Sequence, residues 1–92
     1  KKVLFTQVTM YDSEASFHIF PNPAQDMINV VLPQAMSGQL QVLDAMGREV
    51  HRQEIRKETT VILDLSRISS SGLHFVRIQA NSQVRVAPFM LK

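Results

Sequence analysis

Short β-rich runs separated by turn clusters fill this sequence, and they limit the folds that it can adopt. Apolar and polar residues alternate in several runs, as in Met27–Leu32, Thr60–Leu65 and Leu73–Ala80, which is typical of strands with one buried face. No run sustains a 3.6-residue apolar period, so we expect little helix. The expected strands are Val3–Met10, Phe17–Phe20, Met27–Leu32, Gln39–Asp44, Glu49–Ile55, Thr60–Leu65, Leu73–Ala80 and Val84–Leu91.

These runs follow one another at roughly the 8–12-residue spacing of a β-sandwich. One-sided strands bury their apolar faces when two antiparallel sheets pack together and keep wet outer surfaces. We therefore predict an all-β fold, an immunoglobulin-like antiparallel β-sandwich of about seven strands. Residues 1–16 are expected to form an N-terminal strand or linker that ends in a hinge, and residues 17–92 the domain itself.

The composition fits one small domain and excludes several classes of function. The chain has 92 residues, of which 45% are apolar and 20% charged, with a net charge of +2; this is too little charge for intrinsic disorder. The basic residues are spread out, without the dense stripe of a nucleic-acid surface, so no nucleic-acid partner is expected. The lack of cysteine excludes disulfides, and no run is long enough for a membrane helix.

Patterns that would indicate catalysis or metal binding are missing from the sequence. The three histidines, His18, His51 and His74, fall in different runs without a metal-ligand spacing. The carboxylates are scattered over turns and polar faces, and no nucleophile-elbow, phosphate-loop or zinc-protease motif occurs. A Ser–His–Asp set assembles in space, but nothing in the sequence points to one. We expect no enzymatic activity, no metal and no cofactor.

Two turn signals stand in the first half of the chain. In Pro21-Asn22-Pro23, the prolines fix φ and remove backbone donors, which predicts a stiff corner in which Asn22 bonds nearby backbone N–H groups. In Asp44-Ala45-Met46-Gly47-Arg48, glycine supplies the positive φ of a hairpin loop. We expect Asp44 to accept hydrogen bonds from this turn and to pair with Arg48.

A third turn signal, Ser71-Gly72, opens the last two runs of the chain. His74 lies in the core phase of the first of these runs, so we expect it to be buried and hydrogen-bonded, with Phe75 sharing the aromatic packing. Pro88 in the last run predicts an edge strand, because a central strand would lose a ladder bond there. An exposed edge with apolar side chains is a template for pairing with another chain.

In this order, from about Phe17 to Lys92, the three signals resemble the C-terminal sorting domain of the type IX (Por) secretion system of Bacteroidetes. The Asp-x-x-Gly-Arg turn matches the family pattern fully, whereas His74 stands where the family usually has an aromatic residue, most often tyrosine. The resemblance implies a signal that takes a cargo protein through the periplasm and the outer-membrane machinery to the cell surface or the medium. It also implies removal by a surface sortase, for which Tyr11–Ser16 or just upstream is the expected region.

The resemblance further implies which partners the chain has. They are the translocon or shuttle proteins of the type IX system, the sortase, and an upstream cargo domain of the same chain, whose presence the opening Lys1-Lys2-Val3 also suggests because it does not look like a native start. Exposed edges would also allow the isolated domain to form a homodimer by edge pairing or strand swapping. The candidate recognition residues are Pro21, Asn22, Pro23, Asp44, Gly47, Arg48, Gly72, Val76, Arg77, Arg85, Val86, Met90 and Lys92.

Two other classes of function remain open from the sequence. An immunoglobulin-like or fibronectin-like structural or adhesion module at the end of a surface protein would tolerate loss of its last residues without an export defect. A carbohydrate-binding sandwich would need an exposed aromatic platform, and the chain offers only Tyr11 and five phenylalanines. The choice among the three classes rests on the resemblance, since the pattern alone gives a small β-sandwich.

Overall fold

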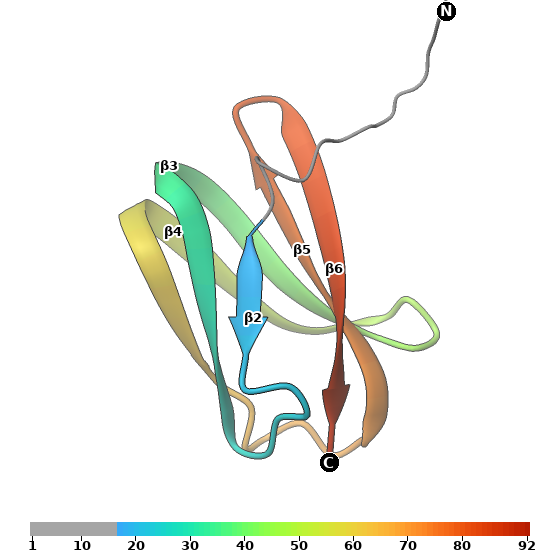
Figure 1. Ribbon diagram of the computed structural model, residues 1–92. Coiled ribbons are helices and arrows are strands. Elements are labelled where there is room, and N and C mark those ends of the chain that lie inside the picture. Colours follow the sequence, from blue (N-terminus) through green and yellow to red (C-terminus); the bar gives the residue numbers. More distant parts are fainter. Residues whose placement is uncertain (1–16) are drawn as a thin grey trace, which may run out of the picture.

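The computed structural model describes residues 17–92, and the strands of this part form one antiparallel sheet (Figure 1). β3 is central: β2, β4 and β5 pair with it, and β6 pairs with β5. The predicted all-β antiparallel fold is confirmed, while the expected strand Val3–Met10 lies outside the described residues. The strands are β2 (His18–Phe20), β3 (Met27–Asp44), β4 (Glu49–Asp64), β5 (Gly72–Ala80) and β6 (Gln83–Leu91).

The strand count differs from the prediction because two pairs of expected strands are continuous. Met27–Leu32 and Gln39–Asp44 lie in the two halves of β3. Glu49–Ile55 and Thr60–Leu65 lie in the two halves of β4, except for Leu65, which follows the end of β4 at Asp64. Register shifts on either side of Met36 take up the residues between the halves of β3, as β-bulges do. The described part of the chain therefore has five strands where about seven were expected for the whole.

The bend in β3 and β4 turns the single sheet into a half-barrel with two facing layers (Figure 1). One layer holds β2 with the first half of β3 and the second half of β4. The other holds the second half of β3 with β5, β6 and the first half of β4. At the bend, Lys57 takes a positive φ of 52°, and its N–H donates to Ser37 Oγ at 3.0 Å.

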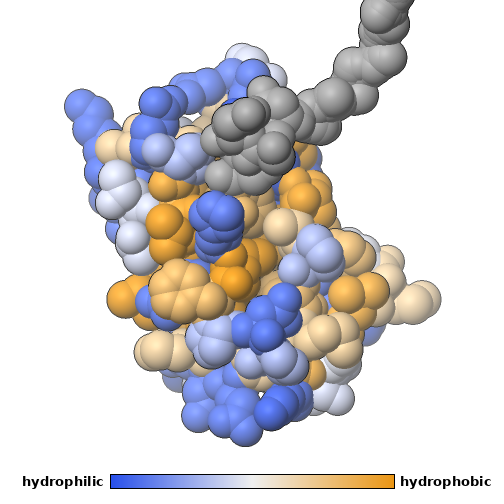
Figure 2. Space-filling view, viewed as in Figure 1, coloured by the Kyte–Doolittle hydropathy of each residue, from blue (hydrophilic) through white to orange (hydrophobic). Residues whose placement is uncertain are grey.

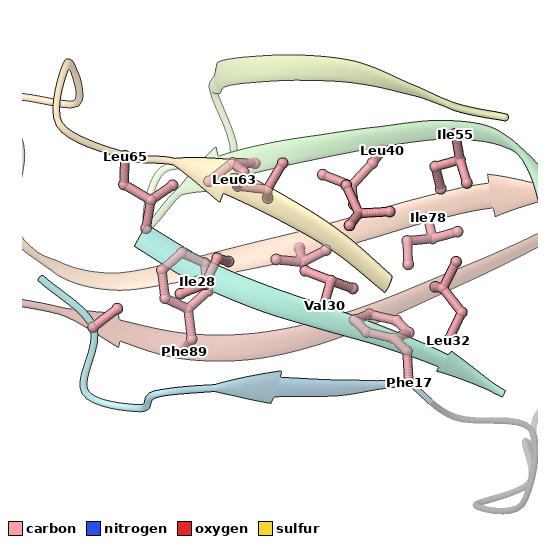
Figure 3. Close-up of a cluster of buried hydrophobic side chains, with 14 of the residues drawn as sticks. Phe17, Ile28, Val30, Leu32, Leu40, Ile55, Leu63, Leu65, Ile78 and Phe89 are labelled. Carbon is pink, nitrogen blue, oxygen red and sulfur yellow. The ribbon is translucent and has the colours of Figure 1, made fainter. Parts of the chain in front are cut away.

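Apolar side chains from both layers meet in one core (Figure 3). Ile28 and Val30 from the first half of β3 and Leu40 and Val42 from the second half are fully buried, so the alternation predicted for these runs is confirmed. Each such side chain stabilises the fold by about 1.5–3 kcal/mol. The other buried apolar residues are Phe17, Ala24, Leu32, Met36, Ile55, Val61, Leu63, Leu65, Val76, Ile78, Phe89 and Leu91.

β5 and β6 form a tight hairpin at the edge of the sheet. Asn81 and Ser82 have φ values of 53° and 62°, which identifies a two-residue type I′ turn. The register runs from Ala80 opposite Gln83 to Gly72 opposite Leu91 without a shift. Within residues 17–92, β5 is the one strand that pairs with β6 along its length, so the edge position predicted from Pro88 is confirmed.

Candidate recognition surface

The Pro21–Pro23 corner lies against the far end of the chain. Asn22 Oδ1 accepts the Met90 N–H at 2.9 Å across 68 residues of sequence. The Ala24 N–H donates to the Met90 carbonyl at 2.7 Å, and the Lys92 N–H donates to the Ala24 carbonyl at 2.8 Å. We call Asn22–Ala24 together with Met90–Lys92 the terminal clamp; it lies at the lower end of the domain, beside the C-terminus (Figure 1).

The terminal clamp brings together two motifs that the sequence treated separately. Asn22 was expected to bond nearby backbone, but its partner is the last strand. The corner is also held from the β3 side, where Asn29 Nδ2 donates to the Phe20 carbonyl at 3.3 Å. No local pattern in the sequence indicates these contacts, because they depend on how the half-barrel closes.

The free edge of β6 is confined to its first part. The Met90 N–H and C=O both point to the corner, and the β5–β6 register has no shift, so the even-numbered residues of β6 direct their backbone away from β5. Pro88 is in this phase, and its missing N–H therefore costs no bond to β5. The sequence predicted a free edge along the whole strand. The proline corner instead covers this edge at Met90–Lys92. From Val84 to Pro88, no strand among residues 17–92 pairs with it.

Exposed apolar side chains follow the outer face of this hairpin. Val84, Val86 and Met90 are 49%, 53% and 46% exposed, and Leu73 on β5 is 41% exposed directly opposite Met90. In the view of Figure 2, apolar residues occupy the middle of the face that carries β2 and β6, with polar residues at its lower end. A row of this kind is typical of a surface that binds another protein.

All charged side chains in the last part of the chain are cationic. Residues 65–92 contain no aspartate or glutamate. The cations that were predicted to orient a partner, Arg77, Arg85 and Lys92, make no ion pair with any residue in the range 17–92. The hairpin therefore presents positive charge next to its exposed apolar row, a combination that favours an acidic partner.

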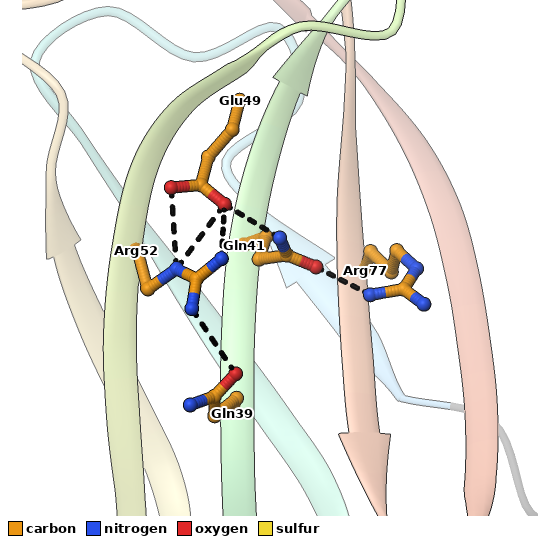
Figure 4. A network of polar contacts seen from close by, with 5 residues as sticks. All are labelled: Gln39, Gln41, Glu49, Arg52 and Arg77. Atoms are coloured by element: carbon orange, nitrogen blue, oxygen red, sulfur yellow. Dashed lines mark hydrogen bonds and ion pairs between the residues drawn. The ribbon is translucent and has the colours of Figure 1, made fainter.

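Arg77 binds a glutamine on β3, and this glutamine in turn contacts a charged pair on β4 (Figure 4). It donates to Gln41 Oε1, and Gln41 Nε2 donates to Glu49 Oε1 at 2.6 Å. Glu49 also forms an ion pair with Arg52 at 2.8 Å, and the Arg52 guanidinium, together with Gln41, holds the pKa of the Glu49 carboxyl below its ordinary value. Arg77 lies opposite Val86 in the register, so its charge stands beside the apolar row.

The Asp44–Arg48 hairpin has the local contacts that the sequence predicts. Asp44 Oδ1 accepts the Met46 and Arg48 N–H groups at 2.9 Å, and Oδ2 accepts Arg48 Nε at 2.9 Å. Gly47 has a φ of +86°, which glycine adopts at no steric cost. The backbone N–H of Arg48, aided by its guanidinium and by Met46 and partly offset by burial, holds the pKa of the Asp44 carboxyl below its ordinary value of 3.8.

We expect the Asp44 contacts to stabilise the domain only while the carboxylate is charged. Because the folded-state pKa lies below the unfolded value, this stability is present above pH 3.8 and is lost as the pH falls through the lowered pKa. In Asp44→Asn, the melting temperature should fall by several degrees at neutral pH, and the difference from the wild type should shrink on acidification. Circular dichroism melts from about pH 7 to about pH 2 measure this; a difference that stays constant with pH would contradict it.

His74 is buried and hydrogen-bonded, as the sequence predicts. It is 1% exposed; its Nδ1–H donates to the Gly72 carbonyl at 3.0 Å, which leaves Nε2 to accept the Ser70 hydroxyl at 3.2 Å. Its aromatic neighbour is Phe89, with ring centroids 5.7 Å apart, rather than the expected Phe75. A Ser–His contact thus exists, but the ring has a carbonyl where a triad has a carboxylate.

The other predicted recognition residues differ in what they can offer a partner. Pro21, Pro23, Gly47, Arg48, Val86, Met90 and Lys92 are exposed, whereas Gly72, Arg77 and Arg85 are half-buried. Val76 is a correction: it is fully buried between β3 and β6, so it cannot touch a partner of the folded domain. Its phase, shared with His74 and Ile78, already indicated the core.

Comparison with known proteins identifies a family whose model matches this chain. Residues 18–92 match the model of a family described as secretion system C-terminal sorting domain, the type IX sorting signals. The match begins at β2 and includes the corner, the hairpin and the terminal strand. No curated protein matches the chain. Among residues 17–92, no helix is long and apolar enough to cross a membrane, and no three acidic or histidine side chains group as metal ligands.

Proposed function

The chain belongs to the family of type IX secretion system C-terminal sorting domains, and from this membership we propose which of its surfaces carries the signal. Domains of this family are sorting signals: they act with the type IX machinery and send an attached cargo to the cell surface or the medium. We place the recognition surface on the outer face and free edge of β6. One observation carries this choice: an apolar strand edge from Val84 to Pro88 lies beside cations in a segment without acidic side chains.

The proposed mechanism is the addition of a partner strand to β6. The outward N–H groups of Val84 and Val86 would supply backbone hydrogen bonds, as in other cases of strand addition. The exposed side chains of Val86 and Met90 would be buried by the partner, and burial of apolar surface stabilises a complex by about 25 cal/mol per Å² before the costs of association. Positive charge at Arg77 and Lys92 would orient an acidic translocon or shuttle protein.

The family membership also supports a proposal for the course of export. The cargo enters the periplasm by its own signal, the sorting domain directs it through the outer-membrane machinery, and a surface sortase then removes the domain. We place removal at Tyr11–Ser16 or just upstream, outside the described residues, because the strand pattern of the sequence breaks there. Intact-mass analysis of secreted cargo tests this, and a cargo that still carries residues 17–92 would contradict it.

We assign no enzymatic role to the domain. The one Ser–His contact in residues 17–92, between Ser70 and His74, involves a ring that is 1% exposed. Both carboxylate oxygens of Asp44 are engaged by its own hairpin. Hydrolysis assays on ester and peptide substrates with the purified domain test this assignment, and turnover that disappears in Ser70→Ala would overturn it.

The finer fold assignment is that the two layers of the half-barrel correspond to the two sheets of an immunoglobulin-like sandwich. The support is the continuous core between the halves of β3 (Figure 3). We also propose that the isolated domain forms a homodimer through the edges of β2 or β6, which stand at the two ends of the strand order. Light scattering of purified domain tests the dimer; a monomer at high concentration would contradict it.

The decisive experiment removes the proposed signal from a reporter cargo in a host with an active type IX system. Deletion of Val84–Lys92 should leave folded cargo in the periplasm. Two surface substitutions refine the result: Val86→Ser should reduce export, whereas Ile62→Ser, which changes a 58% exposed residue on β4, should not. If the deleted cargo still reaches the surface, this chain carries its signal elsewhere, and the structural-module alternative takes its place.

A further inference from the structure

Asn22 is the side chain that joins the proline corner to the terminal strand. Its Oδ1 accepts the Met90 N–H at 2.9 Å, while the backbone of Ala24 holds the Met90 carbonyl at 2.7 Å and the Lys92 N–H at 2.8 Å. These three bonds lie on the side of β6 that faces away from β5. Through these bonds the proline corner holds the last residues of the chain, Met90 to Lys92, on the side opposite β5.

Pairing with β5 extends to Leu91, the last residue of β6, and leaves Lys92 without a partner on that strand. The last register pair is Gly72 opposite Leu91, so the Lys92 N–H is held by Ala24 and not by β5. Strand ends without such contacts fray. Met90 is 46% exposed, so packing of its side chain does little to fix its position.

Ala24 and Asn22 contribute to the terminal clamp in different ways. Ala24 is fully buried and belongs to the core. Its backbone bonds to Met90 and Lys92 therefore form when the core packs. Asn22 is exposed, and the corner around it has its own supports in two prolines and in the bond from Asn29 to the Phe20 carbonyl. The Asn22 side chain is therefore not needed to build the corner, and its acceptor serves Met90.

We propose that Asn22 is a positioning residue of the sorting signal. It keeps Met90–Lys92 in strand geometry, so that the Met90 side chain and the Lys92 charge meet the secretion machinery at fixed positions. The corner and the terminal strand act as one composite signal that exists only in the folded domain. This inference rests on the proposed function, because it assumes that the machinery recognises the outer face of β6.

The role requires a hydrogen-bond acceptor and not an amide. Aspartate at position 22 offers an equivalent carboxylate oxygen to the Met90 N–H, whereas alanine offers none. The matched control is Asn29→Ala, which removes an amide on the other flank of the same corner without touching β6. A second control, Val61→Ala, lowers stability through the core of β4, away from the clamp.

The experiment measures amide exchange in the purified domain and export of a reporter cargo for each variant. In Asn22→Ala, exchange at Met90 and Lys92 should become about five- to tenfold faster, the factor for one lost hydrogen bond, and export should fall. Asn22→Asp should restore both. Asn29→Ala and Val61→Ala should export like the wild type, even where Val61→Ala melts at a lower temperature than Asn22→Ala.

The outcomes separate this inference from the proposed function. Normal export of Asn22→Ala, with fast exchange at Met90, overturns the positioning role and leaves the proposed surface standing. An export defect in Asn22→Asp that equals that of Asn22→Ala overturns it as well. Normal export after deletion of Val84–Lys92 overturns the proposed function itself, and with it the inference. Equal export loss in Val61→Ala would show that stability alone sets export, which also overturns the positioning role.

Discussion

Gly38→Ala should destabilise the domain by about 3 kcal/mol, the upper range for overpacking and a large share of the stability of a domain this small. An added Cβ would lie 2.2 Å from the Gln79 carbonyl oxygen and 2.8 Å from Ala80 Cβ. Most of this obstacle is backbone, so no side chain can move to relieve it. β3 and β5 would have to separate next to the Gln39–Gln79 pair, and the melting temperature should drop by more than about 10 °C.

Gly47→Ala is the matched control for this substitution. Gly47 has a φ of +86°, and a Cβ there would meet no atom within 4 Å. Only the strain of a left-handed backbone is added, which costs about 1–2 kcal/mol. Thermal denaturation of the two variants should separate crowding from strain. Equal shifts would mean that the close approach of β3 and β5 at Gly38 relaxes without cost.

The contrast between these glycines shows how far the sequence predicts the fold. Gly47 stands in a recognisable turn motif, and its hairpin was predicted with its hydrogen bonds. Gly38 ends residues 33–38, a stretch with proline, serine and glycine that the sequence places between two expected strands. The structure keeps that stretch in β3 because Met36 and Gly38 still pair with β4 and register shifts take up the residues between these pairs. Strand continuity depends on these partners, which a local pattern does not contain.

For the candidate site, too, the sequence predicted the features that depend on one strand and missed the contact that depends on the whole fold. The edge position of β6 followed from Pro88, and the buried state of His74 followed from its phase, since both depend on one strand. The bond from Asn22 to Met90 spans 68 residues and arises only when the half-barrel brings the corner to the terminal strand. Val76 was predicted to be a surface residue, although the alternation of apolar and polar residues along its strand placed it in the core. For this residue the sequence pattern already indicated the buried position that the structure shows.

Phe89→Ala should be the most damaging single substitution in the terminal strand, with a loss of about 3–5 kcal/mol. Phe89 is 1% exposed, and its ring packs against His74 at 5.7 Å between centroids. Removal of the ring leaves a cavity under β6 and takes away the packing that fixes the strand on the core. The variant should unfold at a much lower temperature, and a reporter cargo that carries it should no longer be exported.

Met90→Ala is the neighbouring substitution with the opposite expectation. Successive side chains of a strand point to opposite faces, so Met90 is 46% exposed while its backbone, not its side chain, makes the clamp bonds. Its melting temperature should stay within about 4 °C of the wild type, as for surface changes of up to about 0.5 kcal/mol, while export falls. The two adjacent residues thus separate folding of the signal from its recognition. Wild-type export of Met90→Ala would exclude the outer face of β6 as the contact surface, and an unchanged melting temperature in Phe89→Ala would show that the terminal strand is not fixed by this ring.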